Sequence, residues 1–302
     1  MKEVGCCLCG SDAKSVLFAQ EGFDPYLKTI SEDLEKIPRF WCVCDNCGFV
    51  YRSPTLEDHE LARLYEHYEE EIFKSTTPDA YFDKIVGIPD AESENVQKIN
   101  WLKETLGEQG PGKPAADMSV LDVGCGGGTL LYAIFEKLGC TDLCGVEMNK
   151  AYAGLAARRL DADIRNQSYS SGMFERTFDL VVNTKVLEHV PKPGAFIREL
   201  ASDLSPEGIL FLEVPDIMDV YMLPPRHDRF YIPHIFYFSA NTLREFLAGA
   251  GLSIITHRSV TTHRGRSYLQ VLAARSREAA RSDAPYDDPE ALKQKVLERS
   301  GK

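Results

Sequence analysis

Two spacings of apolar residues alternate through the second half of the chain. Short continuous apolar runs predict buried strands, and apolar residues three and four apart predict the helices that connect them. Strands are predicted over 118–123, 143–148, 163–164, 178–183, 208–214, 252–257 and 267–274, and helices over 129–138, 151–159, 193–204 and 241–249. This alternation predicts an α/β fold, in which a mostly parallel sheet carries helices on both faces.

The rest of the chain divides into three shorter parts. Residues 1–55 contain two short apolar segments, which predict the hairpin strands of a small separate module. Residues 56–115 predict a helical lid segment that ends in a Gly/Pro-rich linker before the larger domain at 116–275. Residues 276–302 are polar and charged, and we expect a frayed helix or disorder there.

Two cysteine pairs lie in the N-terminal module. Cys6 and Cys9, and then Cys44 and Cys47, have two residues between them and a glycine after the second cysteine. Four thiolates in two such pairs suit a tetrahedral structural zinc ion, with no coordination position left open for chemistry. We therefore predict a zinc ribbon in residues 1–55, and four unligated thiols are the alternative.

A glycine-rich loop follows the first strand of the larger domain. The run from Leu121 to Gly128 is apolar, then acidic, then rich in glycine, which lacks the Cβ that would keep a ligand away from the backbone. Its G-x-G-x-G spacing differs from the G-x-G-x-x-G of dinucleotide-binding domains, and no Walker-type lysine follows. Glu147 ends the next strand about twenty residues later, where a carboxylate can accept two ribose hydroxyls.

Three motifs in order carry a family resemblance: LDVGCGGGTLL, GVEMN and FDLVVNTKVLEHV. Together they resemble the class I S-adenosylmethionine-dependent methyltransferases over about residues 116–275. The resemblance implies a Rossmann-like domain of seven strands, the last of them antiparallel, with S-adenosylmethionine as its cofactor. An unrelated Rossmann-like domain, for example a dehydrogenase, is the alternative.

The resemblance also implies which residues hold the cofactor, because ligands of open α/β sheets bind at the carboxyl ends of the strands. The implied residues are Asp122, Gly124, Cys125 and Gly126 for the methionine part, Glu147 for the ribose, Met148 and Ser168 for the adenine, and Asn183 and Thr184 for the sulfonium. Two alternatives stay open: Asp122 only braces the loop, and Met148 is a core residue.

Methyl transfer needs alignment, and it needs a base where the acceptor atom begins protonated. Histidine titrates near neutrality, so His189, after the fourth strand, and His234 are candidate bases. The alternative for His189 is a ring that only holds backbone. Tyr68, in the predicted lid, is a third candidate that reaches over the cofactor, and a core-facing aromatic is its alternative.

The segment before His234 is expected to cover the acceptor. Arg226 and Arg229 can pair there with a phosphate or carboxylate, and Tyr231 and Tyr237 can line the pocket. Two solvated arginines are the alternative. The ribbon together with FYFSANTLREFLAGAGL resembles the zinc-containing sugar C-methyltransferases, although a proline precedes His234 where they carry a glutamate.

The net charge of −12 weighs against broad nucleic-acid binding and against a membrane-surface role. The apolar runs are too short to span a bilayer and the first residues form no signal segment, so we expect a cytoplasmic protein. We predict a methyltransferase for a small polar acceptor such as a sugar, a nucleotide-linked sugar or a natural-product intermediate. RNA methylation and a non-catalytic interaction protein are the alternatives. The sequence leaves the methylated atom and the oligomeric state open.

Overall fold

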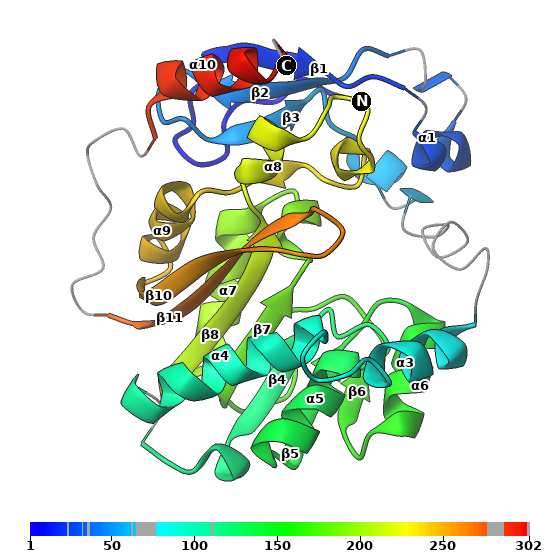
Figure 1. The fold of residues 1–302 in the computed structure, drawn as a ribbon, viewed down its shortest axis with the longest axis vertical. Coiled ribbons are helices and arrows are strands. Elements are labelled where there is room, and N and C mark those ends of the chain that lie inside the picture. The colour runs from blue at the N-terminus through cyan, green and yellow to red at the C-terminus, as the bar shows by residue number, and fades with distance from the viewer. Residues whose placement is uncertain are drawn as a thin grey trace.

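Two β-sheets organise the chain (Figure 1). The computed structural model describes residues 1–22, 24–31, 33–34, 37–61, 63–64, 77–109, 112–276 and 287–300. The predicted candidate Tyr68 lies outside these residues. None of the helices in these ranges has the length and apolar character needed to cross a membrane.

The larger sheet has seven strands in the order β10-β11-β8-β7-β4-β5-β6. Its strands in chain order are β4 (Ser119–Val123), β5 (Asp142–Val146), β6 (Asp163–Arg165), β7 (Phe178–Thr184), β8 (Leu204–Pro215), β10 (Leu252–Thr261) and β11 (Ser267–Arg275). The central pairs are parallel, whereas β11 runs antiparallel to both of its neighbours. The predicted seven-stranded α/β fold with an antiparallel last strand is therefore confirmed.

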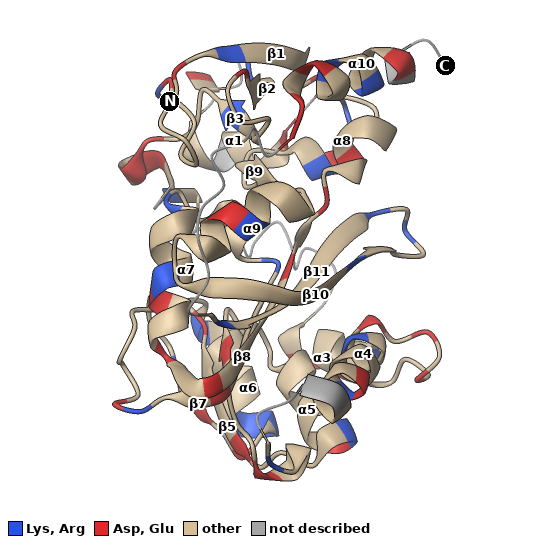
Figure 2. Ribbon diagram, turned by 90° about the vertical axis from the view of Figure 1, so that its left-hand side faces the viewer, with Lys and Arg blue, Asp and Glu red and all other residues tan. Residues whose placement is uncertain are grey.

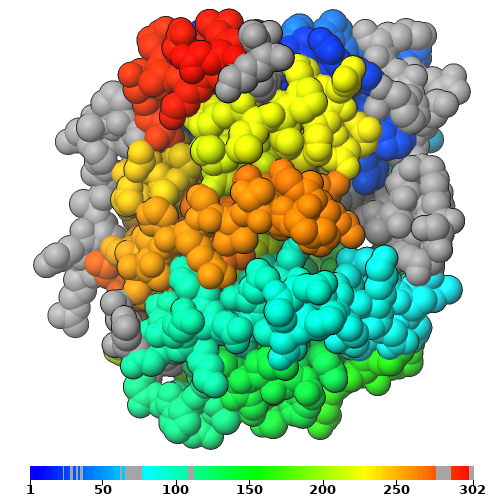
Figure 3. Space-filling model, viewed as in Figure 1, coloured from blue at the N-terminus to red at the C-terminus, as the bar shows by residue number. Residues whose placement is uncertain are grey.

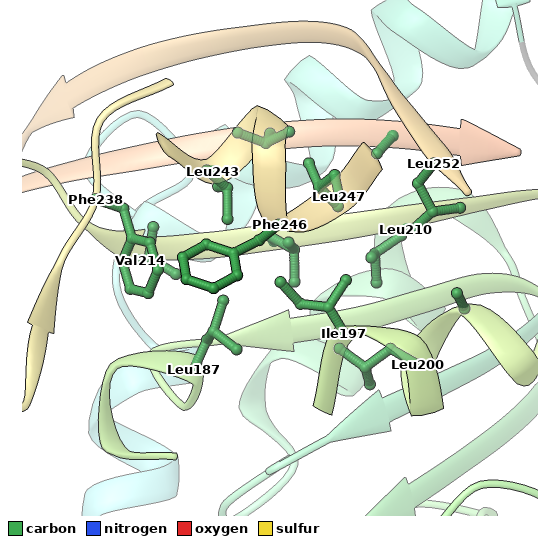
Figure 4. Close-up of a cluster of buried hydrophobic side chains, with 14 of the residues drawn as sticks. Leu187, Ile197, Leu200, Leu210, Val214, Phe238, Leu243, Phe246, Leu247 and Leu252 are labelled. Carbon is green, nitrogen blue, oxygen red and sulfur yellow. The ribbon is translucent and has the colours of Figure 1, made fainter. Parts of the chain in front are cut away.

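Neighbouring residues of the central strands point to opposite faces, and this divides the core into two layers. On one face Val120 and Val182 pack with residues of α4 (Glu94–Gln109) and α5 (Thr129–Leu138). On the other face the core is built on helices α7 (Pro193–Ser202) and α9 (Ala240–Ala248), as Figure 4 shows for Ile197, Leu200, Phe246 and Leu247 around Leu210 of β8.

Residues 77–109 belong to the larger domain. Phe82 of α3 (Pro78–Val86) is buried and packs edge-on against Tyr132 of α5, with ring centroids 5.7 Å apart. Ile99 and Leu102 of α4 are buried in the same core. In Figure 3 this segment, in cyan, lies directly below the orange β10–β11 hairpin. The described part of the predicted lid segment is therefore packed structure. Helix α6 (Lys150–Arg159) follows β5.

The smaller sheet has four strands in the order β1-β2-β3-β9. β1 (Lys14–Ala19), β2 (Phe40–Cys44) and β3 (Val50–Ser53) come from the ribbon, with α1 (Pro25–Ile30) between the first two. β9 (Phe236–Tyr237) comes from the segment after β8 and α8 (Met218–Met222), and pairs antiparallel with β3. The prediction of a separate module is thus revised, because the larger domain completes the ribbon sheet.

The end of the chain also packs on the ribbon. Helix α10 (Pro289–Ser300) buries Leu292 and Val296, four residues apart, in a cluster with Trp41 and Val43 of β2. Lys293, on the same helix, pairs with Asp45 at 3.0 Å. The prediction of a frayed or disordered tail is wrong for residues 287–300. Leu292 and Val296 lie one helical turn apart on the same face, and their burial is enough to hold the otherwise polar helix against the ribbon.

Candidate functional site

The glycine loop after β4 leaves one backbone position facing open space. Gly124, Gly126 and Gly128 all have positive φ, at 82°, 54° and 84°. A Cβ on Gly124 would lie 2.3 Å from Val186, and a Cβ on Gly128 would lie 2.7 Å from Leu160. A Cβ on Gly126 would meet nothing within 4 Å. Packing accounts for the outer two glycines, and Gly126 is the position where a ligand can approach the backbone.

Glu147 lies directly beside this loop. Its Oε2 accepts a hydrogen bond from the Gly126 amide at 2.9 Å, and its Oε1 accepts one from the Asn149 amide at 2.7 Å. Burial raises the pKa of Glu147, and these amides oppose the rise. Each oxygen keeps a second lone pair for a hydroxyl. Met148, the next residue, is 59% exposed, so the alternative that it is a core residue is wrong.

Two buried oxygens at neighbouring strand ends have no hydrogen-bond partner in the described structure. They are Oδ1 of Asp122 on β4 and Oδ1 of Asn183 on β7. Asn183 donates through Nδ2 to the Val123 carbonyl at 2.9 Å, which holds β4 and β7 together. Burial raises the pKa of Asp122 to about 7. Unpaired buried acceptors call for a donor, and the ammonium group of a bound amino acid would supply one.

The remaining predicted cofactor residues have mixed placements. Thr184 ends β7 and is half-buried, and Ser168 is exposed in the segment after β6. Cys125 offers only backbone, because its thiol is buried against Gly145, where a Cβ would lie 2.8 Å from the sulfur. Burial raises the pKa of Cys125, so the thiol stays neutral. The predicted contact of Cys125 with the cofactor would therefore use its backbone.

A pocket of about 330 Å³ lies where the ribbon meets the carboxyl ends of the strands. Its walls come from α1, from the segment after β7, from the segment before β9 and from the start of β11. The lining residues used below are Tyr26, Lys185, Glu188, His189, Arg229, Tyr231 and His234. The structure thus brings three of the predicted site residues, His189, His234 and Tyr231, together in one pocket, and the two imidazole rings lie 5.0 Å apart.

Backbone carbonyls orient both imidazoles. Nδ1 of His189 lies 2.7 Å from the Pro233 oxygen, and Nδ1 of His234 lies 2.8 Å from the Arg229 oxygen. A carbonyl can only accept, so each Nδ1 carries the proton, and a neutral ring presents a lone pair at Nε2. Desolvation lowers the pKa of His234 well below its usual value, with the charges of His189 and Arg229 adding to the effect. His234 is therefore neutral at pH 7.

The structure corrects three predicted acceptor residues. Arg229 lines the pocket, but its guanidinium is buried and paired with Asp219 at 2.7 Å. Tyr237 is fully buried and donates to the Arg229 carbonyl, and Arg226 is exposed outside the pocket lining. Tyr237 and Arg226 therefore lie outside the lining of this pocket, and Asp219 already pairs with Arg229.

Sequence reasoning missed several residues in this pocket and around it. Glu188 is 1% exposed, with Oε1 3.8 Å from Nε2 of His189. Lys185 has a positive φ of 59° and pairs with Glu94 at 3.3 Å. Arg52 of β3 donates to the carbonyls of Phe230, Tyr231 and His234, at 2.8 Å for Tyr231 and 3.1 Å for His234. The only sequence signal was the position of Glu188 and Lys185 beside His189.

The four predicted metal-binding cysteines come together at one end of the ribbon. The Sγ atoms of Cys6 and Cys47 lie 3.6 Å apart, those of Cys9 and Cys44 lie 3.5 Å apart, and all four lie within 4.8 Å of one another. Tetrahedral zinc with Zn–S bonds of about 2.3 Å requires sulfurs about 3.8 Å apart. The cluster therefore fits zinc. Cys7, between the first pair, is exposed.

Comparison with known proteins decides the family. A family model described as a methyltransferase domain matches residues 97–257, more than half of the chain. The chain belongs to the methyltransferase domain family. The match begins inside α4, in agreement with the packing of that helix on the larger domain. A methyltransferase domain is also the class of domain that the three motifs predicted.

Curated relatives of this methyltransferase include two ubiquinone biosynthesis O-methyltransferases. The protein from Parvibaculum lavamentivorans is 34% identical over 105 residues, which cover 33% of this chain and 41% of the relative. The protein from Pseudomonas paraeruginosa is 32% identical over 125 residues, 39% of this chain and 50% of the relative. The chain thus spans about half the length of the curated relatives it matches.

The fold of this methyltransferase also has solved counterparts. An S-adenosylmethionine-dependent methyltransferase from Clostridium acetobutylicum superposes with a TM-score of 0.51 at 12% sequence identity, covering 66% of this chain and 97% of that one. This likeness concerns the fold alone.

Proposed function

We propose that this methyltransferase transfers a methyl group to an oxygen of a small polar molecule bound between the ribbon and the larger sheet. The observation that carries the proposal is the convergence of two backbone-anchored imidazoles in a pocket of about 330 Å³, directly after the strand that ends in Asn183 and Thr184. This volume suits a small acceptor. The two curated relatives are named as O-methyltransferases, which supports oxygen as the methylated atom.

We assign the cofactor to the carboxyl ends of β4 and β5. Glu147 would accept the ribose hydroxyls, the Gly126 backbone would border the cofactor, and Met148 would cover the adenine. The unpaired oxygen of Asp122 would accept from the ammonium group. When bound, S-adenosylmethionine supplies an electrophilic methyl carbon, so these residues need only hold and align it.

The acceptor residues have to position a hydroxyl and remove its proton. Nε2 of His189 or His234 can accept that proton, because each Nδ1 is fixed as the protonated nitrogen. Tyr26 and Tyr231, whose rings lie 6.3 Å apart, provide apolar faces and hydroxyls for a polar ring such as a sugar. We keep a sugar or nucleotide-linked sugar as the proposed acceptor class.

The distribution of charge supports a small acceptor over RNA. Figure 2 shows Lys and Arg interspersed with Asp and Glu over the described elements, without a continuous basic stripe in this view. The net charge of −12 also argues against RNA as the acceptor, since RNA binding needs clustered lysine and arginine side chains.

Label transfer tests the function. Methyl-labelled S-adenosylmethionine is incubated with the protein and three pools, namely polar metabolites with nucleotide sugars, total RNA, and peptides. We expect label in the first pool alone, and at least a hundredfold less with Glu147→Ala, because the ribose would lose its acceptor and the loop its brace. Glu136→Ala, on the exposed side of α5, is the matched control. Label in RNA would replace the proposal by RNA methylation.

Asp122→Asn is expected to raise the stability of the protein without cofactor and to lower its affinity for the cofactor. The pKa of Asp122 is raised to about 7 in the fold, against about 3.9 in an unfolded chain. The folded state therefore keeps a proton that the unfolded state has lost, and stability falls as the pH rises from about 4 to about 7. Without cofactor, Asp122→Asn should unfold at a higher temperature than the wild type at pH 8, and at nearly the same temperature at pH 4.5.

With bound cofactor at pH 8, the wild type should unfold at a higher temperature than Asp122→Asn. An ionised Asp122 would bind the ammonium group, so Asp122→Asn should bind S-adenosylmethionine about ten- to a hundredfold more weakly. Thermal unfolding and calorimetric titration at both pH values measure the two effects. Equal affinities in variant and wild type would show that Asp122 only braces the loop.

A further inference from the structure

One wall of the pocket carries three side chains that we name the Glu-His-His cluster, namely Glu188, His189 and His234. One ligand atom from each residue lies within 4.8 Å of the other two, and Oε1 of Glu188 is 3.8 Å from Nε2 of His189. Glu188 and His189 come from the turn η3 (Leu187–His189), and His234 comes from the segment before β9. Two segments far apart in sequence therefore meet at this point of the pocket.

The hydrogen bonds around the cluster leave mainly acceptors pointing into it. Backbone carbonyls engage both Nδ1 atoms, which leaves Nε2 of each ring as the nitrogen that can bind a cation. Glu188 is 1% exposed and its Oε2 has no hydrogen-bond partner in the described structure. A histidine that donates one N–H to a carbonyl is the usual arrangement of a metal ligand, because it orients the other nitrogen.

The basic residues of the pocket each have a carboxylate partner other than Glu188. Arg229 pairs with Asp219 at 2.7 Å, and Lys185 pairs with Glu94 at 3.3 Å. A buried carboxylate with an unpartnered oxygen is costly unless a proton or a cation meets it. Two imidazole nitrogens and one carboxylate oxygen are a ligand set that Fe²⁺, Mn²⁺ and Zn²⁺ accept.

We propose that Glu188, His189 and His234 bind a divalent cation at the acceptor pocket, distinct from the zinc of the ribbon. Metal–ligand bonds of about 2.1 Å place such ligands about 3 to 3.5 Å apart, so side-chain shifts of about an ångström bring them together. Three protein ligands leave coordination positions for the acceptor. The ribbon site has four thiolates and is closed, so the two sites differ in ligand chemistry.

This site deepens the proposed function and rests on it for its chemical role. An acceptor with two adjacent oxygens, either two hydroxyls or a hydroxyl beside a carbonyl, would bind the cation through both. The hydroxyl proton then passes to water, the oxygen lone pair forms the bond to the methyl carbon, and the C–S pair stays on sulfur. No oxidant or reductant is needed. The histidines then act as ligands rather than as proton acceptors.

Manganese titration tests the site without relying on activity. Mn²⁺ alone is added to the zinc-loaded protein, and binding is followed by the loss of the electron paramagnetic resonance signal of free Mn²⁺. Thiolates are poor ligands for Mn²⁺, so the ribbon should not compete. We expect one bound Mn²⁺ per chain, and at least tenfold weaker binding with Glu188→Gln or with His234→Ala. Asp228→Asn, a carboxylate of the same pocket outside the cluster, should stay within about threefold.

Each outcome decides something different. The site would be overturned if the wild type did not bind Mn²⁺, or if both cluster variants bound Mn²⁺ with the affinity of the wild type. Full methyl transfer in metal-free buffer would also overturn its chemical role and leave the proposed function intact. One Mn²⁺ per chain that both cluster variants weaken, in a protein that methylates none of the three pools, would support the site and count against the proposed function.

Discussion

Arg52→Met is expected to reduce methyl transfer at least about a hundredfold while the affinity for S-adenosylmethionine changes less than about threefold. Arg52 belongs to the ribbon strand β3, yet its guanidinium donates to the carbonyls of Phe230, Tyr231 and His234. These residues belong to the segment 226–234 before β9, which we call the acceptor segment. Burial lowers its pKa to about 10, so it stays charged at neutral pH. Without it, three carbonyls of residues 230–234 lose a donor, and His234 loses a contact that holds its backbone in place.

The same change should also reduce stability. Asp24 is buried and accepts a hydrogen bond from the Ile232 amide at 2.7 Å, and Gln20 connects it to Arg52 by accepting from the guanidinium and donating to the carboxylate. Removal of Arg52 leaves buried acceptors without their donor, at a cost of about 1 to 3 kcal/mol for each, which chemical denaturation can measure. Arg244→Met, on the exposed side of α9, is the matched control. If Arg52→Met keeps the wild-type kcat and KM, the ribbon does not position the acceptor segment.

The seven-stranded sheet could be predicted because its signals are local. Each strand is a continuous apolar run, and the loop from Gly124 to Gly128 marks the turn from β4 to α5 by composition alone. The ribbon strands were predictable for the same reason. β9 was not, because two residues carry no periodic pattern and its pairing with β3 joins positions about 185 apart.

The candidate site was predictable only in the residue types that carry chemistry. His189 and His234 stood out because histidine titrates near neutrality, and the structure places them in one pocket. The sequence assigned Arg229 to a substrate because it cannot show that Asp219, ten positions earlier, occupies the guanidinium. Glu188 was passed over because nothing local distinguishes a buried, partly unpaired carboxylate from an exposed one.

The pocket itself is built between the ribbon and the larger domain, so patterns local to either part do not reveal it. Tyr26 of α1 lines it from the ribbon side, and Phe49 of the ribbon packs edge-on against Phe246 of α9 with ring centroids 5.2 Å apart. The core around Cys44 and Cys47 is continuous with that of β8. A change at the metal end of the ribbon therefore reaches the pocket through packed side chains.

Cys47→Ser is accordingly expected to remove the zinc ion that we propose for the four-cysteine cluster and, with it, methyl transfer. Structural zinc contributes about 10 to 16 kcal/mol to the folding of isolated zinc fingers, so loss of one thiolate should unfold the ribbon well below the wild-type melting temperature. S-adenosylmethionine should still bind, because Glu147 and the glycine loop lie in the larger sheet.

The neighbouring Cys7 provides the control for this change. Cys7 is exposed and lies outside the four-sulfur cluster, so Cys7→Ser should keep one zinc per chain and full activity. Zinc content by atomic absorption, thermal unfolding, cofactor titration and label transfer are compared in the two variants. Normal methyl transfer by zinc-free Cys47→Ser would show that the pocket forms without the ribbon. Loss of cofactor binding in the same variant would instead show that the two sheets fold as one unit, since the core around Phe49 and Phe246 joins them.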